Sequence, residues 1–301
     1  MSAQRFLGLD LGGTNIKTIL LEAVGDDYRV VASSTAPTYA ERGPSTVVDR
    51  VLELGREAIA EHGPAERAGL GIPGLFDPVD GLAVMLPNLP GPWDGIPLTT
   101  PLSAGLGAPV TLVNDARAFT LAEGRMGAGR GTSTLVGMTL GTGVGGGILI
   151  NGKLHLGAWG RAGEIGHQTV LPEGPVCGCG NRGCVEAVAK AEELARLGGR
   201  ATAEEVFAGV REGDPQCRGA VETVATYLGI GLANLVTVLG PDRIVVGGGI
   251  VAAGDLVLDP IRDAIRERVT FVPVEEIDVV AASLGPAAGS IGAALAAVDN
   301  L

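Results

Sequence analysis

Hydrophobic positions along the chain alternate between short β-type runs and longer stretches with helical spacing. Strands are predicted, in chain order, at 5–11, 15–22, around 28–35, 67–71, 109–113, 133–140, 144–151, 243–246 and near 277–281. Helices are predicted over 46–61, 116–126, most of 186–240, near 255–268 and from residue 286 to the end. Alternation of this kind predicts an α/β fold with layered sheets and helices.

Two of the predicted hairpins resemble each other. The first spans 5–22 and the second 133–151, and a Gly/Thr turn joins the strands of each. The two turns lie about 130 residues apart, so we expect two related halves. Ser45 or Thr46 is the expected cap of the first helix, and Gly63 its end.

Composition narrows the class of protein. Of 301 residues, 46% are hydrophobic, 3% are aromatic and 49 are glycine, so small aliphatic residues must build the interior. A chain of this length forms one or two domains. The net charge of −12 and the sequence pI of about 4.7 argue against nucleic acid or an anionic membrane as a partner. The N-terminus has no signal-peptide layout and no apolar run looks long enough to span a bilayer, which favours a cytoplasmic location.

Three glycine turns predict a nucleotide site. Glycine lets backbone N–H groups approach phosphate oxygens, a threonine hydroxyl adds a donor, and a carboxylate at a strand end suits Mg²⁺. The first run carries Asp10, Gly12, Gly13, Thr14 and Lys17, the second Gly141, Thr142 and Gly143, and the third Gly247, Gly248 and Gly249. The alternative for any one of them is a plain turn, but three together favour ATP with Mg²⁺.

The second turn also satisfies the dinucleotide pattern G-x-G-x-x-G, with Glu164 following 18 residues after its last glycine. That pattern requires a helix directly after the glycines. Residues 144–151 are expected to form a strand, which argues against nicotinamide binding. The sequence contains no P-loop motif.

Asp115 is the candidate catalytic base. Asn114 and Asp115 stand where a predicted strand meets a predicted helix, so the alternative is that they only cap this helix. As a base, Asp115 would accept the proton of a sugar hydroxyl while the γ-phosphoryl group moves. The helix N-terminus would keep the carboxylate ionised.

A metal site is predicted from one histidine and three closely spaced cysteines. His167, Cys177, Cys179 and Cys184 offer the donor set of a closed tetrahedral zinc site. The alternatives are a disulfide, which the compartment disfavours, and inert thiols. The remaining Cys217 follows a helical pattern and is expected to be a core residue.

The metal would also fix two carboxylates. Glu164 precedes one ligand by three residues, and Glu186 follows another by two. Carboxylates, together with the amides of Asn88 and Asn114, suit the hydroxyls of a neutral sugar. The second ring nitrogen of His167 would offer a further contact. The alternative for both glutamates is surface ion pairing.

These motifs together resemble the repressor, open reading frame, kinase (ROK) family, and in particular its bacterial glucokinases. The resemblance extends over essentially the whole chain and rests on the segments 10–17, 71–74, 87–89, 114–115, 140–143, 163–167 and 177–186. One departure is visible, because Ala189 stands where family members often carry a serine. We expect it to affect only packing around Glu186.

The resemblance implies an actin-like (ribonuclease H-like) ATPase fold with two α/β domains around a cleft. Residues 1–115 with 286–301 would form the smaller domain and 116–285 the larger one, which holds the zinc. It implies Asp115 as the base and Mg²⁺ near Asp10. The implied sugar contacts are Gly74, Asn88, Asn114, Glu164, His167 and Glu186. The implied ATP contacts are Gly12, Gly13, Thr14, Thr142 and Gly248.

The expected activity is phosphorylation of D-glucose by ATP, in a homodimer or homotetramer. The alternatives are a kinase for mannose, fructose, allose or N-acetylmannosamine, or a sugar sensor without catalysis. The glycine turns leave open whether polyphosphate can replace ATP. Family repressors carry a DNA-binding segment before the first glycine turn. The early position of Asp10 and the acidic charge argue against that role here.

Overall fold

The chain divides into two compact units, each with its own core. The computed structural model describes residues 4–158, 160–270 and 272–301. One unit consists of Met1–Ala122 together with Pro286–Leu301, and the other of Glu123–Gly285. The division lies inside helix α3 (Asp115–Met126), and the resemblance had implied a division after residue 115.

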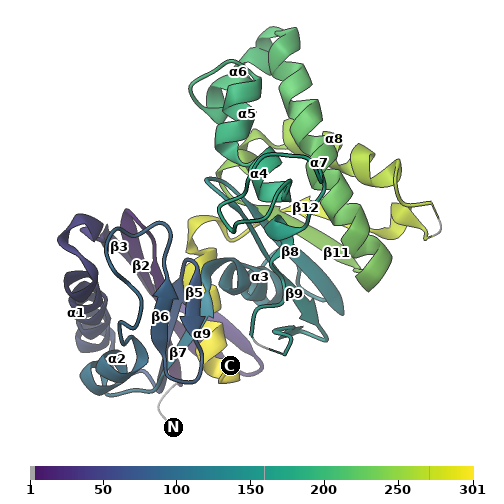
Figure 1. Cartoon of the computed structure of the whole chain (residues 1–301). Helices are drawn as coiled ribbons and strands as arrows, with labels where there is room; N and C mark the ends of the chain where they lie inside the picture. Colours follow the sequence, from purple (N-terminus) through teal and green to yellow (C-terminus); the bar gives the residue numbers. More distant parts are fainter. Residues whose placement is uncertain (1–3, 159, 271) are drawn as a thin grey trace. The chain divides into compact units, whose positions relative to one another are not determined.

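The first unit is built on a five-stranded sheet. Its order is β3 (Asp27–Pro37), β2 (Asn15–Val24), β1 (Arg5–Leu11), β4 (Arg67–Ile72) and β7 (Val110–Asn114). β1, β4 and β7 are parallel to one another, and β2 is antiparallel to β1. Helices α1 (Pro44–His62) and α2 (Thr99–Leu106) pack on one face, and α9 (Ala288–Asp299) packs on the other (Figure 1).

Close packing of α9 on this sheet depends on two glycines that pair across β1 and β4. A side chain on Gly8 would overlap the Ser290 carbonyl, and one on Gly69 would overlap the Ala293 carbonyl. The helix in turn presents small residues such as Ala294. The backbone of α9 therefore lies almost directly on the two central strands, which explains why this small-residue helix is buried.

The second unit repeats the same strand order. Its sheet runs β10 (Lys153–Leu154), β9 (Val144–Ile150), β8 (Thr134–Leu140), β11 (Arg243–Gly247) and β12 (Asp278–Ala281). β9 is antiparallel to β8, while β11 and β12 are parallel to β8, as in the first sheet. The expected duplication of the hairpin is therefore confirmed.

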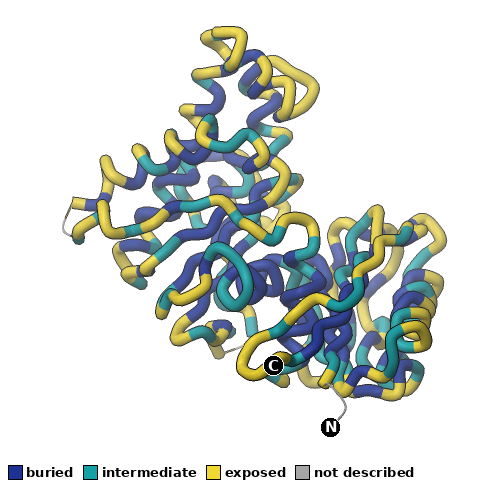
Figure 2. Tube along the Cα trace, turned by 180° about the vertical axis from the view of Figure 1, so that it is seen from behind, coloured by how far each residue is buried: buried dark blue, intermediate teal, exposed yellow. Residues whose placement is uncertain are grey.

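Helices supply most of the remaining core of the second unit. They are α4 (Val185–Ala189), α5 (Ala191–Leu197), α6 (Ala203–Glu212), α7 (Pro215–Leu239) and α8 (Asp255–Arg266). Cys217 is fully buried in this core, as expected from its helical pattern. In each unit the buried positions follow the central strands and the inner faces of the helices, while loops and outer faces are exposed (Figure 2).

Several short elements were not predicted. They are the hairpin of β5 (Leu75–Asp77) and β6 (Leu82–Met85), the helix α2, and 3-10 turns at Ala40–Arg42, Ile165–His167, Gly249–Ala253, Val274–Glu276 and Gly285–Ala287. The expected cap of α1 was wrong. Gly43 is the N-cap residue and Pro44 occupies the first turn, a position that suits proline because its missing N–H needs no partner there.

Helix α7 corrects one expectation from the sequence. With 25 residues it has the length and apolar composition of a possible membrane span, although no run had looked long enough. Half of its most apolar stretch is buried inside the protein, where it packs against α4, α6 and α8. This packing is that of a core helix.

Candidate active site

In the first unit, predicted site residues gather at the carboxyl edge of the sheet. Asp10 at the end of β1 is in register with Gly71 on β4, and Ile72 on β4 is in register with Asn114 on β7. Because the three strands are parallel, their ends meet at one edge, which is where open α/β sheets bind ligands. The motifs at 10–17, 71–74 and 114–115 therefore converge.

Asp10 is a half-buried carboxylate, with its side chain 15% exposed, and it lies beside a lysine. The Lys17 ammonium lies 3.7 Å from its Oδ2. A side chain on Gly289, near the start of α9, would come within 2.5 Å of the same oxygen. Burial raises the pKa of Asp10, and the charge of Lys17 offsets this only in part. A further cation would stabilise the ionised form of this carboxylate. Carboxylate oxygens are ligands that suit Mg²⁺.

The first glycine turn is held from three sides. The Gly12 amide donates to the Asn15 carbonyl at 3.0 Å, which closes the turn. A side chain on Gly13 would lie 2.6 Å from the Asn88 carbonyl oxygen, so the turn lies against the segment that carries this candidate sugar contact. Thr38 completes the support. Its hydroxyl donates to the Gly12 carbonyl at 2.7 Å and its amide to the Thr14 carbonyl at 2.9 Å.

Asn114 and Asp115 stand at the start of α3, and both side chains accept hydrogen bonds from its first amides. The Asn114 Oδ1 accepts from the amides of Ala116 and Arg117 at 3.1 and 3.3 Å, so Asn114 caps α3. Its Nδ2 donates to the Gly74 carbonyl at 3.4 Å. Asp115 begins the helix, is partly exposed, and accepts from the Ala116 amide at 2.8 Å. The Asp115 carboxylate therefore lies at the positive end of the helix.

In the second unit, the second and third glycine turns lie side by side. β11 runs parallel to β8, and Gly247 is in register with Thr139. A side chain on Gly248 would overlap the Leu140 carbonyl, directly before the second turn. The exposed hydroxyl-bearing Thr142 stands in the middle of that turn. Because strand β9 and not a helix follows Gly143, the dinucleotide reading is wrong.

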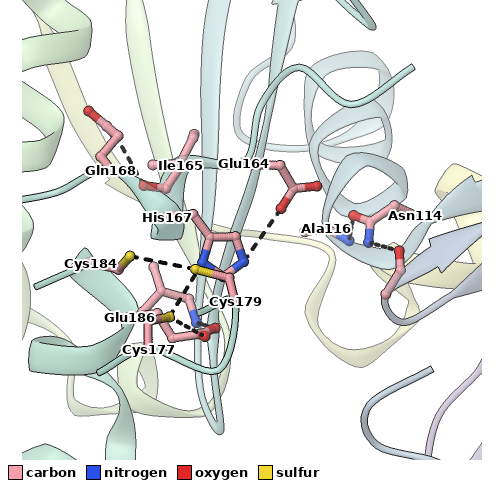
Figure 3. A network of polar contacts seen from close by, with 12 residues as sticks. Asn114, Ala116, Glu164, Ile165, His167, Gln168, Cys177, Cys179, Cys184 and Glu186 are labelled. Carbon is pink, nitrogen blue, oxygen red and sulfur yellow. Dashed lines mark hydrogen bonds and ion pairs between the residues drawn. The ribbon is translucent and has the colours of Figure 1, made fainter. Parts of the chain in front are cut away.

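The three cysteines and His167 form one cluster (Figure 3). The four candidate ligand atoms lie within 4.8 Å of one another. The Sγ atoms of Cys179 and Cys184 are 3.8 Å apart, and the Cys177 Sγ is 3.7 Å from the His167 Nδ1. All four cysteines of the chain are free, so the disulfide alternative is wrong.

The cluster has the dimensions of a tetrahedral zinc site. Zn–S bonds of about 2.3 Å at tetrahedral angles place two sulfurs about 3.8 Å apart, in agreement with the separation of Cys179 and Cys184. Burial raises the pKa of Cys177 to about 12 and also raises that of Cys184. A bound zinc ion would therefore displace protons from these thiols as it binds.

Two carboxylates flank the cluster, as expected. Glu164 Oε2 lies 3.9 Å from the second ring nitrogen of His167, so the ring is positioned between a cysteine and a carboxylate. Such a carboxylate next to a ligand histidine fixes the orientation of the ring. Glu186 contacts Cys177 through Oε1, at 3.6 Å, and the Val144 amide through Oε2, at 3.0 Å.

Sequence reasoning missed Thr38 and the backbone partners of the second turn. Thr38 is fully buried and acts on a turn 26 residues away. The Ala191 amide donates to the Gly141 carbonyl at 2.9 Å. Neither contact leaves a motif in the sequence, because a threonine after a strand and an alanine in a helix are common in any protein.

Comparison with known proteins gives full-length matches. The model of the ROK family matches residues 6–300. A glucokinase of Thermotoga maritima is 35% identical over 313 residues, which cover 98% of this chain and 97% of the relative.

Two solved structures are similar over almost their whole length. A ROK hexokinase from Thermus thermophilus has a TM-score of 0.85 and 35% identity, with 99% of each chain covered. A ROK family glucokinase from Streptomyces griseus, solved with glucose and AMPPNP, has a TM-score of 0.80 and 32% identity. The match covers 99% of this chain and 100% of that one.

Proposed function

Because the chain belongs to the ROK family, with its actin-like ATPase fold, we propose that it is a sugar kinase that transfers the γ-phosphoryl group of ATP to D-glucose, giving glucose 6-phosphate. The observation that carries this proposal is the position of Asp115. Its carboxylate starts α3 at the strand edge that also holds Asp10. A base and a cation-binding carboxylate at one edge are the parts that phosphoryl transfer to a hydroxyl requires.

Asp115 would act as the general base. It accepts the proton of the sugar 6-hydroxyl as the oxygen attacks the γ-phosphorus, and the bond from phosphorus to the ADP oxygen breaks. The helix N-terminus favours the ionised carboxylate that this step needs. An ordinary aspartate pKa near 3.9 suffices, because the hydroxyl becomes acidic only as the new bond forms.

The phosphates of ATP would be held by backbone amides of the glycine turns and by side chains of the first run. Thr14 and Thr142 offer hydroxyl donors, and Lys17 offers a positive charge near Asp10. Amides fixed in advance stabilise the charge that develops on the phosphoryl oxygens without reorganising during the reaction. A Mg²⁺ ion bound near Asp10 would supply further neutralisation of that charge.

The sugar would be recognised by carboxylates and amides. Asn88, Asn114, Glu164, His167 and Glu186 carry donors and acceptors that match hydroxyl groups. Gly74 has a φ of 87°, a backbone conformation that favours glycine. The loop that carries it would lie beside the sugar. A zinc ion in the cysteine cluster would be structural, and it would fix the positions of both glutamates.

The other expectations belong to the same proposal. The chain would work in the cytoplasm as a homodimer or homotetramer and would bind neither nucleic acid nor membranes. The net charge of −12 supports the last point, because phosphate backbones repel an acidic protein.

The test is the Asp115→Asn variant. We expect kcat to fall by about 10²–10⁴-fold, because the amide cannot accept the hydroxyl proton. The dissociation constant for glucose should change little, because an amide still bonds a hydroxyl. Isothermal titration with glucose and a coupled ADP-release assay measure the two quantities. Near wild-type turnover in this variant would overturn the assignment of the base.

The same assay separates the alternatives. ADP release should be fastest with glucose among glucose, mannose, fructose, allose and N-acetylmannosamine, and it should require Mg²⁺. Faster release with another sugar would keep the kinase and change the substrate. Sugar binding without any ADP release would identify a sensor. If glucose were phosphorylated by added polyphosphate in place of ATP, with shortened polyphosphate as the product, the assignment of the phosphoryl donor would change.

A further inference from the structure

The segment that follows the last cysteine of the cluster contacts the second glycine turn at both of its ends. Cys184 is the N-cap residue of α4, Glu186 lies in the first turn of that helix, and Ala191 begins α5. The glycine turn at 141–143 belongs to the β8–β9 hairpin, more than 40 residues earlier in the chain. All of these residues lie in the second unit.

One end of the turn is held by the Glu186 carboxylate. Its Oε2 accepts from the Val144 amide at 3.0 Å, directly after the turn. A side chain on Gly143 would lie 2.6 Å from the same oxygen, so the carboxylate would have to shift if this residue were not glycine. The other oxygen, Oε1, is 3.6 Å from the Cys177 Sγ. One carboxylate therefore contacts both the metal cluster and the turn.

The other end of the turn is held by the backbone. The Ala191 amide donates to the Gly141 carbonyl at 2.9 Å. The Lys190 amide donates to the Glu186 carbonyl at 3.2 Å, which closes α4 and joins it to α5. Between these two attachments, Thr142 remains exposed.

Helix α4 is too short to hold this geometry by itself. It has five residues, and isolated helices of that length do not form in water because nucleation is unfavourable. Its start is fixed by Cys184, a candidate ligand that is fully buried. A metal ion on the cluster would fix Cys184 and Cys177, and with them the residue that contacts Val144.

We propose that Glu186 is a positioning residue for the nucleotide turn, and that it transmits metal occupancy of the cysteine cluster to residues 141–144. Loss of the metal would loosen the turn and weaken ATP binding, in addition to any effect on the sugar. This inference rests on the proposed function only in taking the turn to bind ATP. The structural link between cluster and turn does not depend on it.

The first experiment measures site-resolved hydrogen exchange in the full chain. The zinc content is determined first, and the zinc-loaded protein is compared with chelator-treated protein and with Glu186→Ala. We expect the Val144 amide to exchange about 10-fold faster or more in both treated samples, because a bond to a charged acceptor is lost or loosened. Amides in the middle of β8 should keep their protection. Glu204→Gln, an exposed glutamate on α6, is the matched control and should leave Val144 unchanged.

A second variant keeps the carboxylate but displaces it. In Gly143→Ala the added methyl group would collide with Glu186 Oε2, so the bond to Val144 should weaken while the zinc content stays at the wild-type level. Glu186→Gln should lie between wild type and Glu186→Ala, because its amide oxygen still accepts a weaker bond. Unchanged Val144 exchange after chelation and in Gly143→Ala would overturn the proposed link.

Nucleotide titration separates this inference from the proposed function. With AMPPNP as the probe, we expect the dissociation constant to rise about 10-fold or more in Gly143→Ala and in zinc-free protein. If the wild-type chain bound no nucleotide, the proposed function would fail, and the exchange data would still decide the link. If nucleotide bound equally well to all forms, while Val144 lost protection, the turn would not be the ATP contact and the inference would be wrong.

Discussion

Glu123 shows how much a single side chain can fix in this protein. Its carboxylate is fully buried on α3. It accepts from the amides of Ala128, Ser283 and Leu284 at 2.8–3.1 Å and from the Ser283 hydroxyl at 3.3 Å. The chain passes between the two units after Ala122 and again after Gly285, so one carboxylate ties together the segments at both passages.

Replacing this carboxylate should destabilise the protein. In Glu123→Gln the single amide oxygen cannot accept all four donors, and its NH₂ group would face a backbone N–H. We expect the free energy of unfolding to fall by about 2–4 kcal/mol, measured by urea unfolding. Glu57→Gln, on the exposed face of α1, is the control and should stay within about 0.5 kcal/mol of wild type. Equal stability of the two variants would contradict the role of Glu123.

Site residues that stand close together in the sequence as a motif could be predicted. Contacts between residues far apart in the sequence could not. The cysteine cluster and the glycine turns followed from spacing within a few positions. Glu186 was predicted as a sugar contact, and its bond to Val144, 42 residues away, has no sequence signature. Thr38 was missed for the same reason. Contacts of this kind depend on which strands pair, and single residues do not encode that choice.

At the scale of elements, a carboxylate joins three neighbouring strands of the first sheet, β1, β2 and β3. Glu22 on β2 accepts from Arg5 on β1 at 3.1 Å and from Arg29 on β3 at 2.6 Å. Arg5 and Arg29 are its partners in register on either side. The hydrogen bonds from Arg29, and next from Arg5, lower the pKa of Glu22 below its ordinary value of 4.5.

The lowered pKa of Glu22 makes this edge of the sheet sensitive to acid. Below pH 4.5 the unfolded chain binds a proton at this residue before the folded chain does. The stabilising contribution is therefore complete above that pH and is lost as the pH falls through the lower folded pKa. We expect wild type to exceed Glu22→Gln in urea midpoint at pH 7, and the gap to narrow as the pH falls below 4.5. A gap that stays constant with pH would contradict this assignment.

Periodicity predicted the long elements and missed some of the short ones. The strands of both sheets and the long helices were expected within a few residues of their observed bounds. The β5–β6 hairpin and α2 were not, although the similarly short strands β7, β11 and β12 were. The cap of α1 was misplaced because a serine or threonine near the start was preferred to Gly43.

At the scale of the whole molecule, the two units have separate cores. One buried cluster belongs to the first unit, on β1, β4 and the helices α1 and α2. The other belongs to the second unit and is built on β8, β11 and α4–α8. The two related halves expected from the two hairpins thus correspond to two cores.

Because the two cores are separate, a destabilising substitution in one unit should reduce exchange protection mainly in that unit. A methyl group in Gly69→Ala would overlap the Ala293 carbonyl, so we expect a loss of about 1–3 kcal/mol. Amides of β1 should lose exchange protection, while those of β11 keep it. Gly219→Ala, in a helix and with open space around it, should instead gain up to about 1 kcal/mol. Equal loss of protection in β1 and β11 would contradict two separate cores.

Because α9 packs on the first sheet, it affects the order in which the two units can fold during translation. The strands that carry Gly8 and Gly69 are made early, but the helix that covers their outer face consists of residues 288–299. Nascent chains acquire structure from the N-terminus onward. The early strands of the first unit therefore keep an apolar face uncovered until residues 288–299 have been made. The inserted unit, although made later, has its complete sequence available first.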